Sequence, residues 1–439
     1  ESHQRLCEGM LKYSLGVDCL SASARERQDT GKFGERRIMI FDSESVFEEN
    51  VITVLKQHGW KDGVLRYPTE RDLLDNWKGI LYRNNNDIDR LGKYPLTDGE
   101  MTQIIEQIET LRTPLALNSF VNGRTVSITR DNKEDVAHFG KEVSLYIYDR
   151  KEIAGGKSTY QIAQQPVYPA KNKMLNSRRG DLVLLINGMP LIHIELKKSG
   201  IPVSQATNQI EKYAHEGVFT GLFRLVQIFV AMNPDDAVYF ANPGVDKFNP
   251  SYYFHWADYN NEPICGGQNP GKDEWKLFIG GTSGTAGLLS IPMAHQLIGF
   301  YTIADSADGC LKVLRSYQYI AANAISDVVR KCDWEQRPAT PGRPGGYVWH
   351  TTGSGKTMTS FKSAQLIADS HDADKVVFLM DRIELGTQSL KEYRSFADSE
   401  TEVQGTENTG VLRDKLNSTN VNDTLIVTSI QKMSNVKTG

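Results

Sequence analysis

The apolar positions near the start of the chain recur at the spacing of a helix. Four of them fall three or four residues apart, on one helical face: Phe47, Val51, Val54 and Leu55. Ser45 followed by Glu48 matches a capping box and Gly59 provides a stop, so we expect a helix between these points. Residues 1–38 lack such periodicity and the apolar core of a signal peptide, and we assign them no function.

A period-2 segment follows at residues 181–198, which read as two strands around an Asn187-Gly188 turn. A two-residue loop would place Leu182 opposite His193 and mix polar with apolar residues on each face. A three-residue loop over 187–189 with a glycine bulge makes one face wholly apolar, and we prefer this register. Its apolar pairs are Leu182 with Ile194 and Leu184 with Ile192.

Further along, the apolar residues form short runs separated by helix-length segments. The runs GGYVW, KVVFLM and TLIVTS follow a helical stretch over 313–329, and this alternation is typical of βαβ units with a parallel sheet. Residues 242–284, rich in Gly, Asn and Pro, are expected to form loops rather than core. We therefore divide the chain into an uncertain segment at 1–38, an α/β domain at 39–265, a linker at 266–289 and a second α/β domain at 290–439.

Composition narrows the function classes only slightly. The 439 residues are 39% hydrophobic and 24% charged with a formal net charge of −4, so any nucleic-acid contact must come from local basic patches. One such patch comprises Lys171, Lys173, Arg178 and Arg179. No apolar run approaches a membrane span, and we expect no membrane partner. The five cysteines are scattered without metal-ligand spacing, which favours a reducing cytoplasm.

The preferred hairpin register gathers three charged residues. It places Asp181 opposite Glu195, with Lys197 two residues further along the same face. Paired carboxylates suit Mg²⁺, which polarises a phosphate and lowers the pKa of a bound water, and Lys197 could orient that water. Asp181 and Glu195 are therefore the candidate metal ligands. The alternative is a hairpin that carries these charges on a solvent-exposed face.

The order Asp181, then Glu195 and Lys197 one residue apart, resembles the core of the PD-(D/E)xK nucleases. Gln209 and Tyr213 are four residues apart on one helical face and resemble the QxxxY element that some of these nucleases carry beside the metal site. The resemblance implies a restriction-endonuclease-like domain in which these five residues are catalytic.

In that resemblance a further acidic residue comes from the first helix, here Glu44 or Glu48. Glu48 already has a sufficient role in the expected capping box. His193 also lies on the face of the candidate site, but a single histidine is more often structural, and we leave it out of the site.

The segment after GGYVW predicts nucleotide binding. A strand, a glycine loop and a helix follow in order, and Phe361, Ala364 and Ile367 of that helix can face a sheet. In such loops the backbone N–H groups cradle phosphates, Lys356 reaches the outer phosphates, and the Thr357 hydroxyl ligates Mg²⁺. The alternative is a polar turn that binds no nucleotide. The candidate ATP-binding residues are Thr352, Gly353, Ser354, Gly355, Lys356 and Thr357.

His350 stands where the pattern G-x-x-x-x-G-K-[ST] has its first glycine, and this replacement resembles motif I of superfamily 2 helicases. Gln318 resembles the Q-motif glutamine that reads adenine edges, residues 377–388 resemble motif Ia, and residues 428–431 resemble a later DNA-contacting motif. These resemblances imply the first RecA-like lobe of a motor. No acidic Walker B box follows in the sequence, so we expect this piece to bind nucleotide far better than it hydrolyses it.

A PD-(D/E)xK domain before a superfamily 2 lobe resembles the restriction subunit of type I restriction-modification enzymes, over roughly residues 40–439. That resemblance implies ATP- and Mg²⁺-dependent translocation and cleavage of double-stranded DNA, with methylation and specificity subunits as partners. Two other assignments stay open: a DNA repair helicase-nuclease, and a nucleotide-binding DNA motor with a non-cutting N-terminal domain. Type III restriction subunits usually place the nuclease after the motor, so the domain order argues against them.

Overall fold

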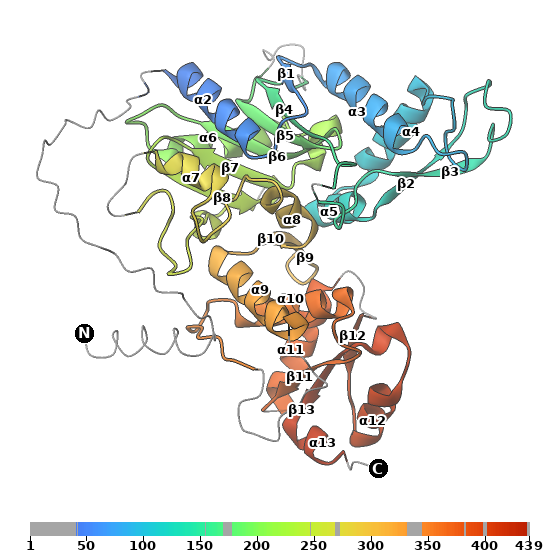
Figure 1. Ribbon diagram of the computed structural model, residues 1–439, viewed down its shortest axis with the longest axis vertical. Helices are drawn as coiled ribbons and strands as arrows, with labels where there is room; N and C mark the ends of the chain where they lie inside the picture. The colour runs from blue at the N-terminus through green and yellow to red at the C-terminus, as the bar shows by residue number, and fades with distance from the viewer. Residues whose placement is uncertain are drawn as a thin grey trace, which may run out of the picture.

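The computed structural model describes residues 41, 43–153, 155–169, 178–245, 247–267, 273–331, 345–381, 383–397 and 402–436 (Figure 1). Residues 1–38, Lys171, Lys173 and Arg382 of the expected segments lie outside them. The chain is an α/β protein with a mixed sheet in its N-terminal part and a smaller parallel sheet in its C-terminal part. Within the described ranges, no helix combines the length and apolar character needed to cross a membrane.

A six-stranded sheet forms the centre of the N-terminal part, in the order β1-β4-β5-β6-β7-β8. The pairs β1–β4 and β6–β7 are parallel and the other pairs are antiparallel. Every residue of β4 to β8 is buried, so both faces of the sheet are covered. The strands span Val64–Arg66 (β1), Tyr160–Gln164 (β4), Leu182–Ile186 (β5), Met189–Leu196 (β6), Ile228–Met232 (β7) and Ala237–Ala241 (β8).

Helices cover this sheet (Figure 1). Helix α6 packs on β6 and β7, where its Ala206 and Ile210 join a buried cluster with Phe229 and Ala231. Helix α2 contacts β6 and α7. The helices of this part are α2 (Glu44–Gln57), α3 (Glu70–Asn84), α4 (Asp98–Thr110), α5 (Pro114–Asn122), α6 (Val203–His215), η1 (Gly221–Leu225), η2 (Pro250–Tyr252), α7 (Glu274–Gly280) and α8 (Met293–Gly299).

The first expected helix is confirmed as α2, and its four apolar residues are buried. The expected capping box is wrong. Ser43, with extended φ and ψ of −134° and 147°, is the N-cap and accepts from the Val46 N–H, whereas Ser45 already lies inside the helix. Glu48 therefore has no capping role, and its side chain is buried.

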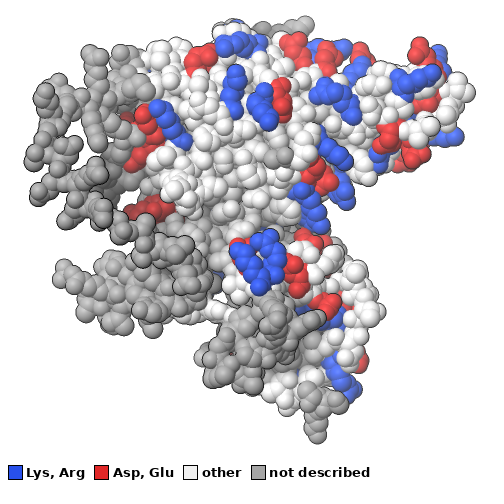
Figure 2. Space-filling view, viewed as in Figure 1, with Lys and Arg blue, Asp and Glu red and all other residues white. Residues whose placement is uncertain are grey.

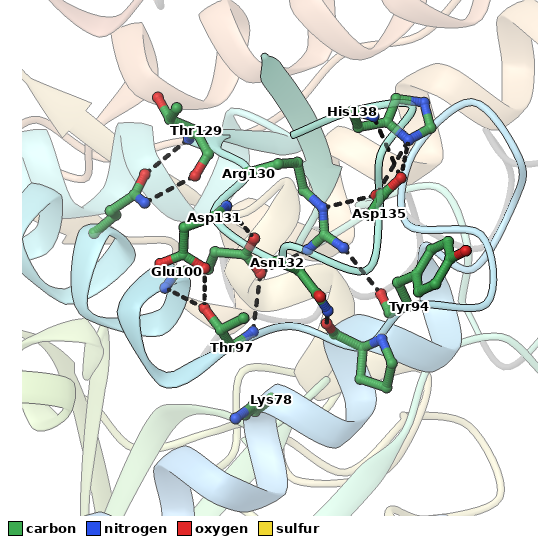
Figure 3. Close-up of polar contacts among 12 residues, drawn as sticks. Lys78, Tyr94, Thr97, Glu100, Thr129, Arg130, Asp131, Asn132, Asp135 and His138 are labelled. Carbon is green, nitrogen blue, oxygen red and sulfur yellow. Dashed lines mark hydrogen bonds and ion pairs between the residues drawn. The ribbon is translucent and has the colours of Figure 1, made fainter. Parts of the chain in front are cut away.

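A two-stranded arm, β2 (Thr125–Thr129) with β3 (Glu142–Tyr146), extends from this part and is anchored by a buried charge network (Figure 3). The fully buried Arg130 guanidinium lies 2.6 Å from Glu100 of α4 and 3.1 Å from Asp135. Glu100 also accepts from the backbone N–H groups of Thr97 and Asp131, each at 2.9 Å. The network joins α4 to the arm, and its pairing and hydrogen bonds offset the desolvation cost of the buried charges.

The C-terminal part begins with a hairpin and continues into a parallel sheet of order β11-β13-β12. The runs KVVFLM and TLIVTS form β11 and β13 as expected, and the helix expected over 313–329 is α9. The buried side chains of Phe361, Ala364 and Ile367 confirm the inner face of α10. The elements are β9 (Thr302–Asp305), β10 (Cys310–Val313), α9 (Ser316–Lys331), α10 (Lys356–Ser370), β11 (Val376–Met380), α11 (Ile383–Phe396), β12 (Val403–Gly405), α12 (Thr409–Asn417), η4 (Val421–Asp423), β13 (Leu425–Ser429) and α13 (Ile430–Ser434).

Two expectations about this half of the chain are wrong. The run GGYVW forms no strand, and Trp349 is 81% exposed, because no described strand pairs with it. Most described residues of the region 242–284 lie outside helices and strands, as expected, but the expectation that the region lies outside the core is wrong, because Trp256 and Trp275 are buried. A high Gly and Pro content indicates loops and does not show which side chains between them are buried.

Replacing Arg130 with Met should destabilise the fold by about 3–5 kcal/mol, because Glu100 and Asp135 would stay buried without their cation. Urea unfolding measures this change. Arg71→Met is the matched control, since Arg71 is exposed and its ion pairs with Asp75 and Asp98 are solvent-screened. Equal stability of the two variants would contradict a structural role for the network.

Candidate functional site

The β5–β6 hairpin has the expected strand pairing but a different turn. Leu182 pairs with Ile194 and Leu184 with Ile192, as the preferred register requires. The loop contains two residues rather than three: Asn187 and Gly188 have φ of 52° and 83°, as in a type I′ turn. The extra residue is taken up by a bulge further along, where the register shifts between Leu184 and Leu185.

Gly188 is required at this turn for two reasons. Its φ is positive, and a Cβ there would lie 2.9 Å from the Cα of Trp77 in α3. The turn is therefore held against α3, which fixes the hairpin relative to the helices.

The structure brings Asp181, Glu195 and Lys197 together. Asp181 Oδ2 accepts from the Leu196 N–H at 2.7 Å, so this carboxyl lies against the β6 backbone next to Glu195. Lys197 Nζ lies 3.6 Å from Glu195 Oε1 and donates to the Leu196 carbonyl at 2.8 Å. Glu195 is 0% exposed and Lys197 8% exposed. The alternative of a solvent-exposed charged face is therefore wrong.

Burial dominates the electrostatics of this site. Burial raises the pKa of Asp181 well above its ordinary value, and the nearby Glu195 charge adds to that increase. Burial also raises the pKa of Glu195 to about 8, although the Lys197 ammonium opposes it. Neither carboxylate oxygen of Glu195 has a hydrogen-bond donor. The pair thus has unused acceptor capacity and favours an added cation.

Helix α2 brings two more acids close to this site. Glu44 Oε1 lies 3.7 Å from Lys197 Nζ. Glu48 is buried and accepts hydrogen bonds from Gln164 at 2.6 Å and Gln165 at 3.1 Å. The Gln165 N–H in turn donates to the Asp181 carbonyl at 2.7 Å, which links Glu48 to the strand that carries Asp181.

His193, which sequence reasoning treated as structural, contacts the carboxylate pair. It is fully buried, and burial lowers its pKa to about 4, so the ring is neutral at pH 7. Nδ1 lies 2.8 Å from the Tyr168 hydroxyl, and Nε2 lies 3.3 Å from Glu195 Oε2. If Tyr168 donates to Nδ1, Nε2 carries the proton and faces Glu195. The sequence could have indicated this contact, because His193 and Glu195 lie on the same face of one strand. Nothing in the sequence pattern indicated Tyr168.

Gln209 and Tyr213 meet on α6, but they bond to each other. Gln209 Nε2 donates to the Tyr213 hydroxyl at 2.6 Å, and that hydroxyl donates to the Arg179 carbonyl at 2.9 Å. Burial, together with the charge of Glu195, raises the pKa of Tyr213. The two residues therefore position the backbone just before Asp181. Tyr213 also lies close enough to the carboxylates for their charge to raise its pKa.

The expected basic patch is only partly described. Arg178 is paired with Glu216 at 2.9 Å, and Arg179 lies 5.8 Å from the Tyr67 ring centroid. Among the described side chains, no group of three or more His, Cys, Asp or Glu residues is arranged to hold a metal ion. The candidate site offers two carboxylates, which is within the number that protein-bound Mg²⁺ ordinarily uses.

The glycine loop at residues 350–357 has the backbone expected of a phosphate cradle. Gly353 and Gly355 have φ of 77° and 79°, and α10 begins directly at Lys356. Thr352 and Lys356 are exposed and Thr357 half-buried, and Lys356 Nζ donates to the Thr351 carbonyl at 3.1 Å. The loop therefore presents a helix N-terminus and an accessible ammonium on one side.

Gln318 is placed beside this loop, but its amide is already engaged. Its Oε1 accepts from the Arg315 N–H at 3.0 Å, and its Nε2 donates to the Gly355 carbonyl at 3.3 Å. Tyr317, which sequence reasoning missed, donates from its hydroxyl to the Ser354 carbonyl at 2.8 Å. Residues 315–318 thus fix the loop to α9.

Comparisons with known proteins match two separate segments of the chain, one around the acid pair and one around the glycine loop. A family model described as "Type I restriction enzyme R protein N terminus" matches residues 42–248, and one described as "SWI2/SNF2 ATPase" matches residues 317–439. The type I restriction enzyme endonuclease subunit of Staphylococcus saprophyticus is 32% identical over 404 residues, which cover 90% of this chain and 37% of that protein. The chain belongs to the type I restriction enzyme R protein family.

Two other relatives agree. The endonuclease subunit of Staphylococcus aureus strain MSSA476 is 33% identical over 398 residues, covering 90% of this chain and 37% of that protein. The EcoprrI endonuclease subunit of Escherichia coli is 26% identical over 321 residues, covering 71% of this chain and 90% of that protein. This R protein chain therefore spans just over a third of the length of the first two relatives.

The two sites of this R protein fall in different matched segments. The set around Asp181 lies inside the R protein N-terminal match, and the glycine loop lies inside the SWI2/SNF2 ATPase match. The segment expected to resemble motif Ia begins on β11, and Thr428 and Ser429 end β13. The glycine loop, β11 and β13 follow in the expected order, except that GGYVW before the loop forms no strand.

Replacing Glu195 with Gln should make stability less dependent on pH in a chelating buffer. Folding raises the pKa of Glu195 from 4.5 to about 8, so the unfolded state releases its proton first and stability falls as pH rises through that window. The amide has no proton to lose, and the variant should retain roughly 1–3 kcal/mol more stability at the alkaline end. Urea unfolding at several pH values measures the difference.

The control for this comparison is Glu134→Gln, which changes an exposed carboxyl and should keep the wild-type pH dependence. A wild-type pH dependence in Glu195→Gln as well would mean that the burial of Glu195 does not control its ionisation.

Proposed function

We propose that this chain carries the DNA-cutting domain and the first motor lobe of a type I restriction enzyme R subunit. Its whole-protein activity would be Mg²⁺-dependent cleavage of double-stranded DNA coupled to ATP-dependent translocation. The observation that carries the nuclease part is the buried Glu195 carboxylate, whose two oxygens lack donors beside Asp181 and Lys197. Buried carboxyl groups whose pKa values are strongly shifted cluster at functional sites, which supports a role for this pair.

Asp181 and Glu195 would hold the Mg²⁺ ion, because paired hard oxygen ligands with unused acceptor capacity match its preference. When bound, Mg²⁺ supplies charge neutralisation at a scissile phosphate and a more acidic water. The Thr357 hydroxyl would take the corresponding role for the Mg²⁺ that accompanies ATP.

The protein's own groups prepare the reaction around these ligands. The Leu196 N–H orients Asp181, and Lys197, held by the Leu196 carbonyl, places an ammonium where negative charge grows on phosphate oxygens. Tyr168 bonds to the His193 ring, and that ring lies against the Glu195 carboxylate and limits its movement. Tyr213, which is bonded to Gln209, fixes the backbone just before β5.

The fold supports this assignment. The mixed sheet with its acid pair at the end of a hairpin agrees with a PD-(D/E)xK nuclease domain, and the parallel β11-β13-β12 sheet after a glycine loop agrees with a RecA-like lobe. We keep two α/β domains as part of the proposal, but the segment expected to be a linker at 266–289 packs in the core of the first domain through Trp275 and Leu288, and that core continues past residue 290 to Leu314.

The surface charge of this chain is mixed, which agrees with DNA selection by partner subunits. On the face shown in Figure 2, Lys and Arg alternate with Asp and Glu and form no single positive field. A formal net charge of −4 for the whole chain neither favours nor excludes DNA binding, which depends on local basic patches. Methylation and specificity subunits would choose the DNA, and the motor would grip its backbone.

Lys197→Ala should reduce DNA cleavage about 100-fold or more while ATP hydrolysis stays near wild type, because only the nuclease site loses its ammonium. The assay uses the full R subunit carrying this sequence, reconstituted with methylation and specificity subunits. Lys198→Ala is the matched control, since the adjacent lysine is exposed. Undiminished cutting by Lys197→Ala would refute the assignment of this hairpin.

Lys356→Ala should abolish measurable ATP binding without unfolding the chain, because the exposed ammonium at the start of α10 would no longer reach the outer phosphates. Calorimetry measures the affinity, and circular dichroism checks the fold. Lys391→Ala, which removes an exposed lysine of α11, should bind ATP normally. Equal affinities in both variants would exclude the loop as the phosphate site.

A further inference from the structure

A cavity of about 540 Å³ lies between the glycine loop and the N-terminal sheet. The loop contributes Gly353 to Gly355 and α10 contributes Met358. The opposite wall comes from the edge of β8 and the segment after it, including Phe254. Strands β8 and β10 contact each other beside this cavity, where the N-terminal part meets α9 and α10 (Figure 1). Its volume is that of an ordinary small-ligand site.

The Phe254 wall is a fixed part of the N-terminal sheet. Phe254 and Tyr239 of β8 exchange backbone hydrogen bonds of 2.9 and 3.0 Å, so the segment extends the sheet beyond its edge strand. The fully buried Tyr239 also donates from its hydroxyl to the Leu314 carbonyl at 2.9 Å. Tyr239 therefore positions Phe254 through its backbone and the segment that leads to Arg315 through its side chain.

Arg315 and Phe254 form a stacked pair at this wall. The guanidinium lies 4.4 Å from the ring centroid of Phe254, and its Nη1 donates to the Tyr317 hydroxyl at 3.1 Å. Through Tyr317 the pair is connected to the Ser354 carbonyl of the glycine loop. A flat cation on an aromatic ring, at one end of a cavity whose other end is a phosphate loop, matches the planar base of a nucleotide.

Gln318 is bonded to the protein at both ends of its amide. Its Oε1 accepts from the Arg315 N–H and its Nε2 donates to the Gly355 carbonyl, and a Cβ on Gly355 would lie 2.5 Å from Nε2. The glutamine therefore ties the loop to α9, and the ring face of a base is left to the other side chains that line the cavity.

We propose that the base of the bound nucleotide lies in this cavity against Phe254 and Arg315, so that the N-terminal part of the chain supplies one wall of the nucleotide site. This inference rests on the proposed binding of ATP phosphates at residues 352–357. Stacking recognises the ring face of a base and not its edge pattern, so the wall contributes affinity more than selectivity among purines.

The test compares a ligand that has a base with one that does not. Affinities of Mg²⁺-ATP and Mg²⁺-tripolyphosphate are measured by calorimetry for the wild-type chain, Phe254→Leu and Phe254→Ala. Loss of the aromatic face should weaken ATP binding roughly tenfold and leave tripolyphosphate binding unchanged. Phe254→Leu retains apolar bulk, so it separates loss of stacking from loss of packing. Tyr259→Ala is the control, because Tyr259 is exposed in the same segment and does not line the cavity.

Each outcome distinguishes the two proposals. A lower ratio of ATP to tripolyphosphate affinity in both Phe254 variants, with a wild-type ratio in the control, supports the base site. An unchanged ratio overturns it, whether the two affinities stay the same or fall together. If the wild-type chain binds neither ligand, the proposed phosphate site itself fails, and the base site fails with it.

Discussion

The burial of two carboxyl groups at one point of the central sheet is the constraint on which the proposed nuclease site depends. Asp181 has the Leu196 N–H as a donor, but Glu195 has only the ammonium of Lys197 at 3.6 Å and the neutral ring of His193 nearby. Removing such groups from water costs several kcal/mol unless protons or cations compensate. The strands β4 to β8 are buried on both faces, so their apolar packing creates this cost and also supplies the hydrophobic stabilisation that offsets it.

Much of the geometry of the candidate site follows from pairing rules. A strand period of two and an apolar face were enough to place Asp181 beside Glu195 and Lys197 beyond them. They were not enough to place the extra residue, because a three-residue loop and a bulge give the same pairing at Leu182 and differ only near the turn. Likewise, Ser43 and Ser45 are equivalent as caps until backbone angles are known, and this ambiguity hid the position of Glu48.

Features that depend on residues far apart in the chain could not be predicted from the sequence. The run GGYVW has the composition of a strand, but a strand exists only when another pairs with it. Tyr168 reaches His193 across the fold, and no local pattern announces that contact. The apolar core of the N-terminal part also continues through Leu297, Val313 and Leu314, although composition suggested a change near residue 284. The α/β class and the order of the sites were predictable because they rest on local periodicity.

The added segment at Phe254 joins the edge of the same sheet that contains Glu195. Glu195 is paired with Ala231 on β7, Ala231 with Val238 on β8, and the next residue, Tyr239, with Phe254. These four neighbouring chains are spaced by about 4.8 Å, which sets Phe254 roughly 14 Å from the Glu195 backbone. Backbone ladders resist stretching, so the sheet acts as a spacer of constant length. The sheet and the Tyr239–Phe254 bridge therefore hold the acid pair and the aromatic wall at a set separation.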